Sequence, residues 1–378
     1  MKLIHLSDLH LGKRVNEFSM LEDQSHILWQ ILSVVDDEKP DAVIIAGDVY
    51  DKSVPNTEAV TLFDRFLSSL CARALPVFII SGNHDSPERL SFGGGLFKNS
   101  GIFFSPVYNG EAQPVYLEDE HGKLAVWMLP FIKPANVRRF YPDEPCQTYT
   151  EAVKTALSHF EIDNSIRNVL VTHQFVTGAS RSDSEEISVG GSDNVDASVF
   201  DAFDYVALGH IHGPQNVGAK HIRYCGTPLK YSFSEAKHEK SVTVAELLEK
   251  GALNIRTIPL SPLRDMREIK GKYDELMLRE NYENANREDY LRVILTDEED
   301  VPDAVRRMRV VYPNIMKLEY DNRRTRASFS AEGAENTEKK SPIELFSELF
   351  SIQNQHEMSD EQENFMLTLI ERIKEGEI

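Results

Sequence analysis

Positive charge is scarce in this sequence. Its 378 residues include 41 Lys and Arg but 61 Asp and Glu, which gives a formal net charge of -20 at pH 7. So acidic a balance argues against broad, non-specific binding to nucleic acid, because the phosphate backbone is repelled. Binding to a nucleic acid would therefore depend on local features that outweigh the net charge.

Cysteine and long hydrophobic runs are also rare. The three cysteines, Cys71, Cys146 and Cys225, are odd in number and far apart, so we expect reduced, mostly buried thiols in place of disulfides or a Cys-based zinc site. No apolar run approaches the roughly 18 residues of a membrane span. The apolar stretch within residues 1–8 is too short for a signal peptide. These features predict a cytoplasmic protein.

Short hydrophobic runs alternate with helical patterns in the first part of the chain. Segments 2–6, 41–46 and 75–80 read as strands, and segments 22–37 and 57–71 place apolar residues on one helical face. This alternation is typical of an α/β layered fold with its site at the strand ends. The 378 residues also exceed the roughly 250–300 at which one hydrophobic core stops growing, so we expect more than one domain.

The character of the chain changes after about residue 262. A strand at 290–295, a helix at 302–312 and a strand at 315–320 predict a small separate unit. Two capped amphipathic helices, 341–352 and 359–374, follow a polar stretch; their apolar faces either pack on the main domain or bind a partner. We predict four parts: a main domain at 1–262, a small domain at 263–322, a linker at 323–340 and a helical segment at 341–378.

Polar residues with metal-ligating side chains follow the predicted strands directly. Any one of them alone would pass for an ordinary loop residue, but the set recurs at successive strand ends. Carboxylate, imidazole and amide oxygen together suit manganese, iron or zinc better than calcium, and the absence of thiolate disfavours a structural zinc site. The candidates are Asp8, His10, Asp48, Asn83, His84, His173, His210 and His212. Seven ligands drawn from these eight residues are too many for one ion, but with one shared carboxylate they fill two sites of four.

The ordered motifs Asp-x-His, Gly-Asp-x-x-Asp, Gly-Asn-His-Asp, His and Gly-His-x-His resemble those of the calcineurin-like metallophosphoesterase superfamily. Residues 203–212 and 224–228 further resemble the SbcD family of bacterial nuclease subunits, and this resemblance covers nearly the whole chain. It implies a β-sandwich flanked by helices, a small α+β capping domain for DNA recognition, and a C-terminal helical pair that binds an ATPase partner.

The resemblance also implies roles for individual residues. One ion would be held by Asp8, His10, Asp48 and His212, and the other by Asp48, Asn83, His173 and His210, with manganese as the family metal. His84 would stand beside the scissile phosphate, where it stabilises charge or protonates the leaving oxygen, and Asp85 would orient it. Archaeal members carry a second catalytic histidine at the position where this chain, like bacterial members, has Asp51, so the resemblance implies one such histidine here, His84.

The function implied is that of a dimetal-dependent DNA nuclease. It would act as an ATP-dependent double-strand exonuclease and as a single-strand and hairpin endonuclease in DNA end processing, repair and recombination. The implied partners are the SbcC ATPase in a heterotetramer, a second copy of this chain, and DNA in the nucleoid. The sequence contains no Gly-x-x-x-x-Gly-Lys-Ser/Thr loop, which is consistent with ATP hydrolysis by the partner.

The acidic net charge is compatible with this function. Two divalent ions bring +4 and the carboxylates of Asp8 and Asp48 bring -2, so the site would carry about +2 where a phosphodiester docks. Four further cations either extend this positively charged region or are ordinary solvated surface groups: Lys13, Arg14, Arg138 and Arg139.

Two alternatives stay open at this point. The first is another calcineurin-like phosphodiesterase or a phosphatase, although protein phosphatases of this fold usually have Gly-Asn-His-Glu where this chain has Asp85. The second is a non-catalytic scaffold that binds metal and partner. A scaffold would not need His84, which is not required as a ligand.

Overall fold

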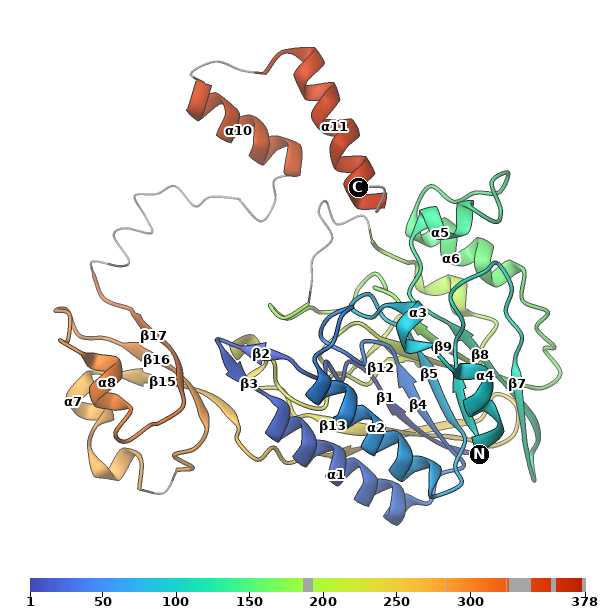
Figure 1. Cartoon of the computed structure of the whole chain (residues 1–378), viewed down its shortest axis with the longest axis horizontal. Coiled ribbons are helices and arrows are strands. Elements are labelled where there is room, and N and C mark those ends of the chain that lie inside the picture. The colour runs from blue at the N-terminus through green and yellow to red at the C-terminus, as the bar shows by residue number, and fades with distance from the viewer. Residues whose placement is uncertain (186–192, 284, 324, 326–340, 355–357, 376–378) are drawn as a thin grey trace.

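Two six-stranded sheets form the centre of the molecule (Figure 1). The computed structural model describes residues 1–185, 193–283, 285–323, 325, 341–354 and 358–375. The first sheet has the order β14 (Leu253–Pro259), β13 (Ser241–Leu247), β1 (Lys2–Leu6), β4 (Ala42–Ala46), β5 (Val77–Ile80), β6 (Ile102–Phe104). The second has the order β11 (Gln215–Val217), β12 (Ala219–Tyr224), β10 (Tyr205–Gly209), β9 (Arg167–His173), β8 (Gly122–Leu129), β7 (Val115–Asp119).

The sheets pack on each other through their inner faces. Leu3, Ile44 and Phe78 of the first sheet share one buried cluster with Val169 and Ala207 of the second. Strand β1 is parallel to β4, β4 is parallel to β5, and β9 is parallel to β10. Because parallel strands end at the same edge of a sheet, the polar residues that follow these strands are brought to one side of the sandwich.

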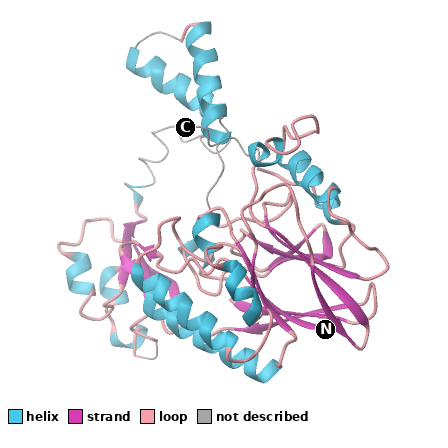
Figure 2. Cartoon of the chain, turned by 45° about the vertical axis from the view of Figure 1, so that its right-hand side comes forward, coloured by secondary structure: helices cyan, strands magenta, loops and turns pink. Residues whose placement is uncertain are grey.

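Helices cover the outer faces of both sheets (Figure 2). On the first sheet, α1 (Leu21–Glu38) and α2 (Thr57–Cys71) contribute to one buried cluster, and on the second sheet α5 (Pro134–Arg138) and α6 (Tyr149–Ser158) contribute to another. The predicted α/β layered sandwich is therefore confirmed. The remaining short elements of this part are β2 (Arg14–Val15), β3 (Phe18–Ser19), α3 (Pro87–Leu90), α4 (Gly94–Phe97), η1 (Lys98–Ser100), η2 (Ala197–Phe200) and η3 (Phe233–Glu235).

A small unit with its own hydrophobic core follows the sandwich. Its sheet has the order β15 (Met266–Gly271), β16 (Tyr290–Leu295), β17 (Ile315–Tyr320), with α7 (Tyr273–Leu276), η4 (Arg279–Asn281) and α8 (Ala304–Met308) between the strands. All three strands are parallel, so the unit is α/β and the predicted α+β class is wrong. The sequence pattern did not predict β15, and it predicted a helix at 302–312 where α8 covers only Ala304–Met308.

Contacts with the buried carboxylate of Asp23 help to tie this unit to the sandwich. Arg264 Nη1 lies 2.8 Å from the buried carboxylate of Asp23 in α1, and the Tyr290 hydroxyl donates to the same carboxylate over 2.8 Å. A cavity of about 340 Å³ lies beside these contacts, and its lining includes Met20, Lys240 and Met266.

The C-terminal helices α10 (Pro342–Asn354) and α11 (Asp360–Glu375) pack on one another, and Figures 1 and 2 both draw them apart from the two sheets. Phe346, Phe350, Met358 and Phe365 line an apolar groove of about 290 Å³ between them. The predicted linker, residues 323–340, lies almost wholly outside the described residues. Within the described part of the chain, no helix combines the length and the apolar character needed to cross a membrane.

The inter-sheet core contains a histidine whose burial predicts a pH-dependent stability. His5 is fully buried with Nδ1 2.8 Å from the Tyr205 hydroxyl, and burial, aided by Arg223, lowers the pKa of His5 to about 3. Because the unfolded chain takes up a proton near pH 6.5 and the folded chain does not, this stabilisation is present above pH 6.5 and is lost as pH falls.

We expect the metal-free wild-type chain to lose about 2 kcal/mol more unfolding free energy than metal-free His5→Gln between about pH 7 and about pH 5. Glutamine keeps an acceptor for Tyr205 but does not titrate. Urea unfolding of both proteins at the two pH values measures the difference. Equal losses in the two proteins would show that His5 is not the titrating group.

Candidate metal centre

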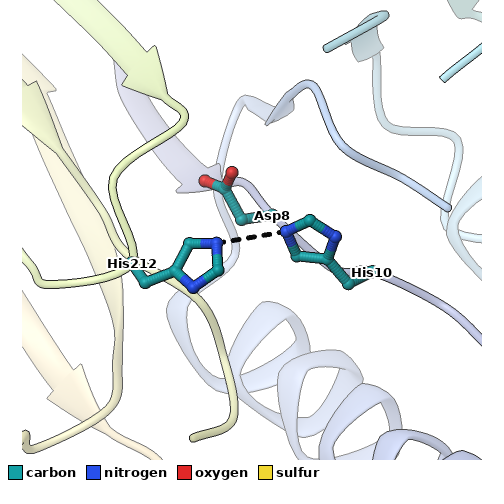
Figure 3. A group of neighbouring side chains, drawn as sticks. All are labelled: Asp8, His10 and His212. Carbon is teal, nitrogen blue, oxygen red and sulfur yellow. Dashed lines mark hydrogen bonds between the residues drawn. The ribbon is translucent and has the colours of Figure 1, made fainter. Parts of the chain in front are cut away.

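The ends of five strands bring together all seven residues predicted as metal ligands. Asp8, His10 and His212 face one another, with His10 Nε2 only 3.2 Å from His212 Nε2 (Figure 3). Within this group each residue offers one ligand atom, and these atoms lie within 4.8 Å of one another. Asp8, Asp48 and His173 form a second such group, which shares Asp8 with the first.

Asn83 and His210 complete the cluster beside the second group. The Asn83 Oδ1 atom lies 3.0 Å from His173 Nε2 and 2.9 Å from His210 Nδ1. Asp48 lies between the two sides of the cluster, since its Oδ2 atom is 3.3 Å from His173 Nε2 and 3.7 Å from His10 Nε2. This is the position that a carboxylate shared by two ions would need.

The backbone is strained where it presents these side chains. Asp8, His10, Asp48 and His210 all have positive φ, at 53°, 44°, 48° and 102°. Such conformations cost on the order of 1–3 kcal/mol each in non-glycine residues and persist only where the surroundings hold them. The surroundings here are hydrogen bonds between the strand-end loops, for example from the Asp8 amide to the Gly47 carbonyl oxygen (3.0 Å) and from the His210 amide to Asp8 Oδ1 (3.0 Å).

Two glycines allow the loops to approach this closely. A Cβ atom on Gly82 would lie 2.1 Å from Asp48 Oδ1, and one on Gly209 would lie 1.9 Å from the Ala46 carbonyl oxygen. Neither gap admits a side chain, so any substitution at these two positions would displace the strand end that carries a candidate ligand.

The donor atoms fit a divalent cation. His173 Nδ1 lies 2.9 Å from the Ala46 carbonyl oxygen, which can only accept, so Nδ1 carries the proton and Nε2 directs its lone pair at Asp48 and Asn83. Three acceptor atoms that face one another require a positive charge between them. In the metal-free chain a proton supplies it: burial alone would lower the pKa of His173, but the charge and hydrogen bond of Asp48 raise it to about 9.

Burial also shifts the pKa of the Asp8 carboxylate. Burial raises the pKa of Asp8 to about 6, and the charge of Asp48 adds to that rise, whereas His173 and His212 oppose it. Fully buried carboxylates and imidazoles are stable only when paired, and divalent ions are the partners that this mixture of ligands prefers. The residues present therefore fit a dimetal group.

His84 lies beside this cluster, with Nε2 4.0 Å from Asp48 Oδ2 and its amide donating to Asp48 Oδ1 over 2.9 Å. Asp85 was expected to orient the His84 ring, and its carboxylate contacts backbone amides of the strand-end loops. His84 Nδ1 lies 3.0 Å from the carbonyl oxygen of Asp51, while the Asp85 carboxylate accepts the amides of Val49 (3.1 Å) and of two further residues, Tyr50 (2.9 Å) and Gly82 (3.0 Å). The Asp85 carboxylate thus ties two strand-end loops together, while the Asp51 carbonyl oxygen contacts the His84 ring.

Comparison with known proteins shows which families the chain resembles. Residues 1–214 match the family model of calcineurin-like phosphoesterases, and residues 262–354 match a model described as the type 5 capsule protein repressor C-terminal domain, SbcD_C. A protein of Staphylococcus epidermidis, named as the SbcD component of the nuclease SbcCD, is 34% identical over 84% of this chain and 85% of its own length. The protein of the same name from Staphylococcus saprophyticus is 35% identical over 84% of each chain.

The chain belongs to the SbcD family of calcineurin-like phosphoesterases. Membership makes it a phosphodiester hydrolase and implies bound divalent metal ions. A solved dimetal phosphatase from Danio rerio is 10% identical with a TM-score of 0.40, over 70% of this chain and 98% of that one. So remote a likeness carries no argument about the site.

Sequence reasoning missed the residues behind this SbcD-family site. Ser184 Oγ lies 2.6 Å from His212 Nδ1 and donates to Glu235 Oε1 over 2.5 Å, and Glu235 in turn pairs with Lys240 over 2.5 Å. Burial alone would raise the pKa of Glu235, but His212 and Lys240 together hold it well below its usual range. No motif marks these residues, because each is an ordinary polar residue that lies far along the chain from its partners.

The four cations named from the sequence are mostly engaged locally. Lys13 pairs with Asp51 over 2.7 Å, and Asp51 Oδ1 also lies 3.7 Å from His10 Nδ1, so this pair borders the cluster. Arg14 donates to the Glu17 carbonyl oxygen, Arg138 to the Cys146 carbonyl oxygen, and Arg139 lies over the Phe140 ring. Among the contacts of these four cations with described residues, the Lys13–Asp51 pair is the one that reaches a candidate ligand, His10.

Proposed function

We propose that this chain is the nuclease subunit of a DNA end-processing complex and that it hydrolyses DNA phosphodiester bonds with two bound divalent ions, best served by Mn²⁺. The observation that carries this proposal is the convergence of seven ligands on both sides of the Asp48 carboxylate, with His84 beside them as a group that no ion needs. The two staphylococcal relatives, both named as part of the nuclease SbcCD, support the choice of a nucleic acid over other phosphodiesters.

We assign Asp8, His10, Asp48 and His212 to one ion and Asp48, Asn83, His173 and His210 to the other. Bound ions of this kind activate water and neutralise charge on a phosphoryl group. The chain's own part is to fix the ligands, through the strained strand ends and the hydrogen bonds between loops that hold them.

We assign His84 to the phosphoryl group as a proton donor to the leaving oxygen or as a stabiliser of its charge. The Asp51 carbonyl oxygen accepts from His84 Nδ1, which fixes the ring so that its Nε2 edge lies on the side of the ligands, 4.0 Å from Asp48 Oδ2. Asp85 acts as a positioning residue, because it joins the loop that carries Asn83 and His84 to the loop after Asp48.

A substrate comparison tests this function. The metal-free protein, supplied with Mn²⁺, should cleave a single-stranded oligonucleotide and a DNA hairpin and should stop when the metal is chelated. An aryl phosphate monoester supplied in the same buffer tests the alternative. Hydrolysis of the monoester without cleavage of DNA would replace the nuclease by a phosphatase, and binding of metal without either reaction would support a scaffold.

We also propose the division into residues 1–262, 263–322, 323–340 and 341–378, with the second part as a DNA-facing cap. The small unit has its own core and the family model that matches residues 262–354 begins at the proposed boundary, which supports the first division. The helical pair beyond it presents an apolar groove in which Phe365 is 67% exposed. We assign that groove to the SbcC ATPase.

A substitution in the groove tests this assignment. Phe365→Glu should weaken binding of SbcC by roughly 30-fold or more, because a large exposed aromatic anchor is worth about 2 kcal/mol at an interface. Truncation after residue 340 should abolish binding, and both proteins should keep Mn²⁺-dependent cleavage of single strands. Calorimetry with purified SbcC and a nuclease assay give the two readouts. A lower thermal midpoint together with lost nuclease activity would mean instead that the helices cover the chain's own core.

We propose a second copy of this chain as a further partner. Phe92 and Leu96, which lie in and beside α4, are 84% and 80% exposed, and Val60 in α2 is 44% exposed. A contiguous exposed apolar patch marks a protein interface, and Phe92 and Leu96 lie within one short segment. Sedimentation of wild type and Leu96→Glu tests this, since the variant should sediment as a monomer.

A further inference from the structure

A buried chain of polar groups leads from a lysine to one of the candidate metal ligands. Glu235 has no exposed surface and Lys240 is 6% exposed, and the two form an ion pair of 2.5 Å. The hydroxyl of Ser184 lies between Glu235 Oε1, at 2.5 Å, and His212 Nδ1, at 2.6 Å. The direct distance from Glu235 Oε1 to His212 Nδ1 is 3.5 Å, which is too long for a good hydrogen bond, so the hydroxyl is required as the link.

The direction of each proton in this chain follows from chemistry. The Glu235 carboxylate is paired with Lys240 and can only accept, so the single hydroxyl proton of Ser184 must point toward it. The oxygen of Ser184 is then an acceptor toward His212, and His212 Nδ1 must carry a proton. In a neutral imidazole this leaves the lone pair on Nε2, the atom that faces His10 Nε2 at 3.2 Å.

We propose that Ser184 and Glu235 are positioning residues that fix the tautomer of His212, so that its Nε2 lone pair points into the metal centre. This inference rests on the proposed function, because it assigns His212 as a ligand. Lys240 completes the arrangement: its Nζ atom also donates to the His212 carbonyl oxygen over 2.9 Å and to Thr227 Oγ1 over 2.6 Å. The same ammonium group therefore neutralises Glu235 and anchors the backbone of the ligand.

Removal of the Ser184 hydroxyl is the sharpest test, because it breaks the link but leaves the buried ion pair intact. Ser184→Ala should bind two Mn²⁺ ions with one of them roughly 10- to 100-fold weaker than in wild type, the usual effect of losing a residue behind a ligand. Ser184→Thr keeps the hydroxyl and should restore wild-type affinity. Ser234→Ala is the matched control, since Ser234 contacts the same loop at the Asp183 amide (2.9 Å) but not His212.

Calorimetric titration of the metal-free full-length proteins with Mn²⁺, with thermal midpoints as a check on folding, measures all four proteins without a nuclease assay. Ser184→Ala with wild-type affinity for both ions would overturn the inference, and so would Ser184→Thr as weak as Ser184→Ala. A wild-type chain that binds fewer than two ions would instead overturn the proposed function, so the two failures are distinguishable.

Discussion

Asp48→Ala is expected to abolish DNA hydrolysis and to lower the Mn²⁺ content at both sites. The carboxylate of Asp48 lies 3.3 Å from His173 on one side of the cluster and 3.7 Å from His10 on the other, so its loss removes a ligand from each ion at once. A single stabilising donor in an active site is worth about 10²–10³ in rate, and the loss of a shared ligand should exceed that. Metal analysis of the purified variant beside a nuclease assay gives both readouts.

The control is a carboxylate outside the cluster. Asp36 in α1 pairs with Arg73, and its side chain is 55% exposed, so Asp36→Ala should leave metal content and nuclease activity unchanged. An Asp48→Ala protein that keeps one full equivalent of Mn²⁺ would show that Asp48 does not serve both ions. The loss of activity alone would not be sufficient support.

His84→Ala should separate catalysis from metal binding. Its ring has a fixed position through the Asp51 carbonyl oxygen, and the proposed assignment gives it no ion to hold. We expect hydrolysis to fall by about 10²–10⁴, the range for a positioned acid or base, while the Mn²⁺ content stays near two ions per chain.

A histidine far from the site provides the matched control. His159 stacks on Tyr141 at 3.8 Å and pairs with Glu144, so His159→Ala should keep both activity and metal. Full activity in His84→Ala would remove its assigned role. Because His10, Asp48 and His84 also lie within ligating distance of one another, loss of one Mn²⁺ from His84→Ala would reassign His84 as a ligand.

The sandwich and the gathering of the candidate ligands followed from local signals in the sequence. Apolar runs of four to six residues became β1, β4 and β5 with nearly the expected bounds, because strands buried on both faces contain little besides aliphatic residues. The residues after parallel strands then had to meet at one edge, whatever the details of the loops. Asp8 and His212 follow strands of different sheets, so they were grouped by their metal-ligating side chains and motifs, and the packing of the two sheets brings them together.

The structural features that the sequence did not predict depend on tertiary contacts. Strand β15 reads Met-Arg-Glu-Ile-Lys-Gly, and its charged residues hide a strand that is buried on one side only. In α2 the buried residues are Ala59, Phe63, Phe66 and Leu70, whereas Val60 is exposed, because the apolar residues of that helix fit two neighbouring faces. The amide partners of Asp85 could not be predicted for a related reason: the backbone amides that it accepts come together only in the folded loops.

Two ions that share Asp48 and leave His84 unligated are central to the proposed function. A crystal structure of the full chain grown with Mn²⁺, with anomalous scattering recorded at the manganese edge, tests this arrangement most directly. We expect two anomalous peaks bridged by the Asp48 carboxylate, one beside His10 and His212 and the other beside Asn83, His173 and His210. A single peak, or a peak coordinated by His84, would contradict it.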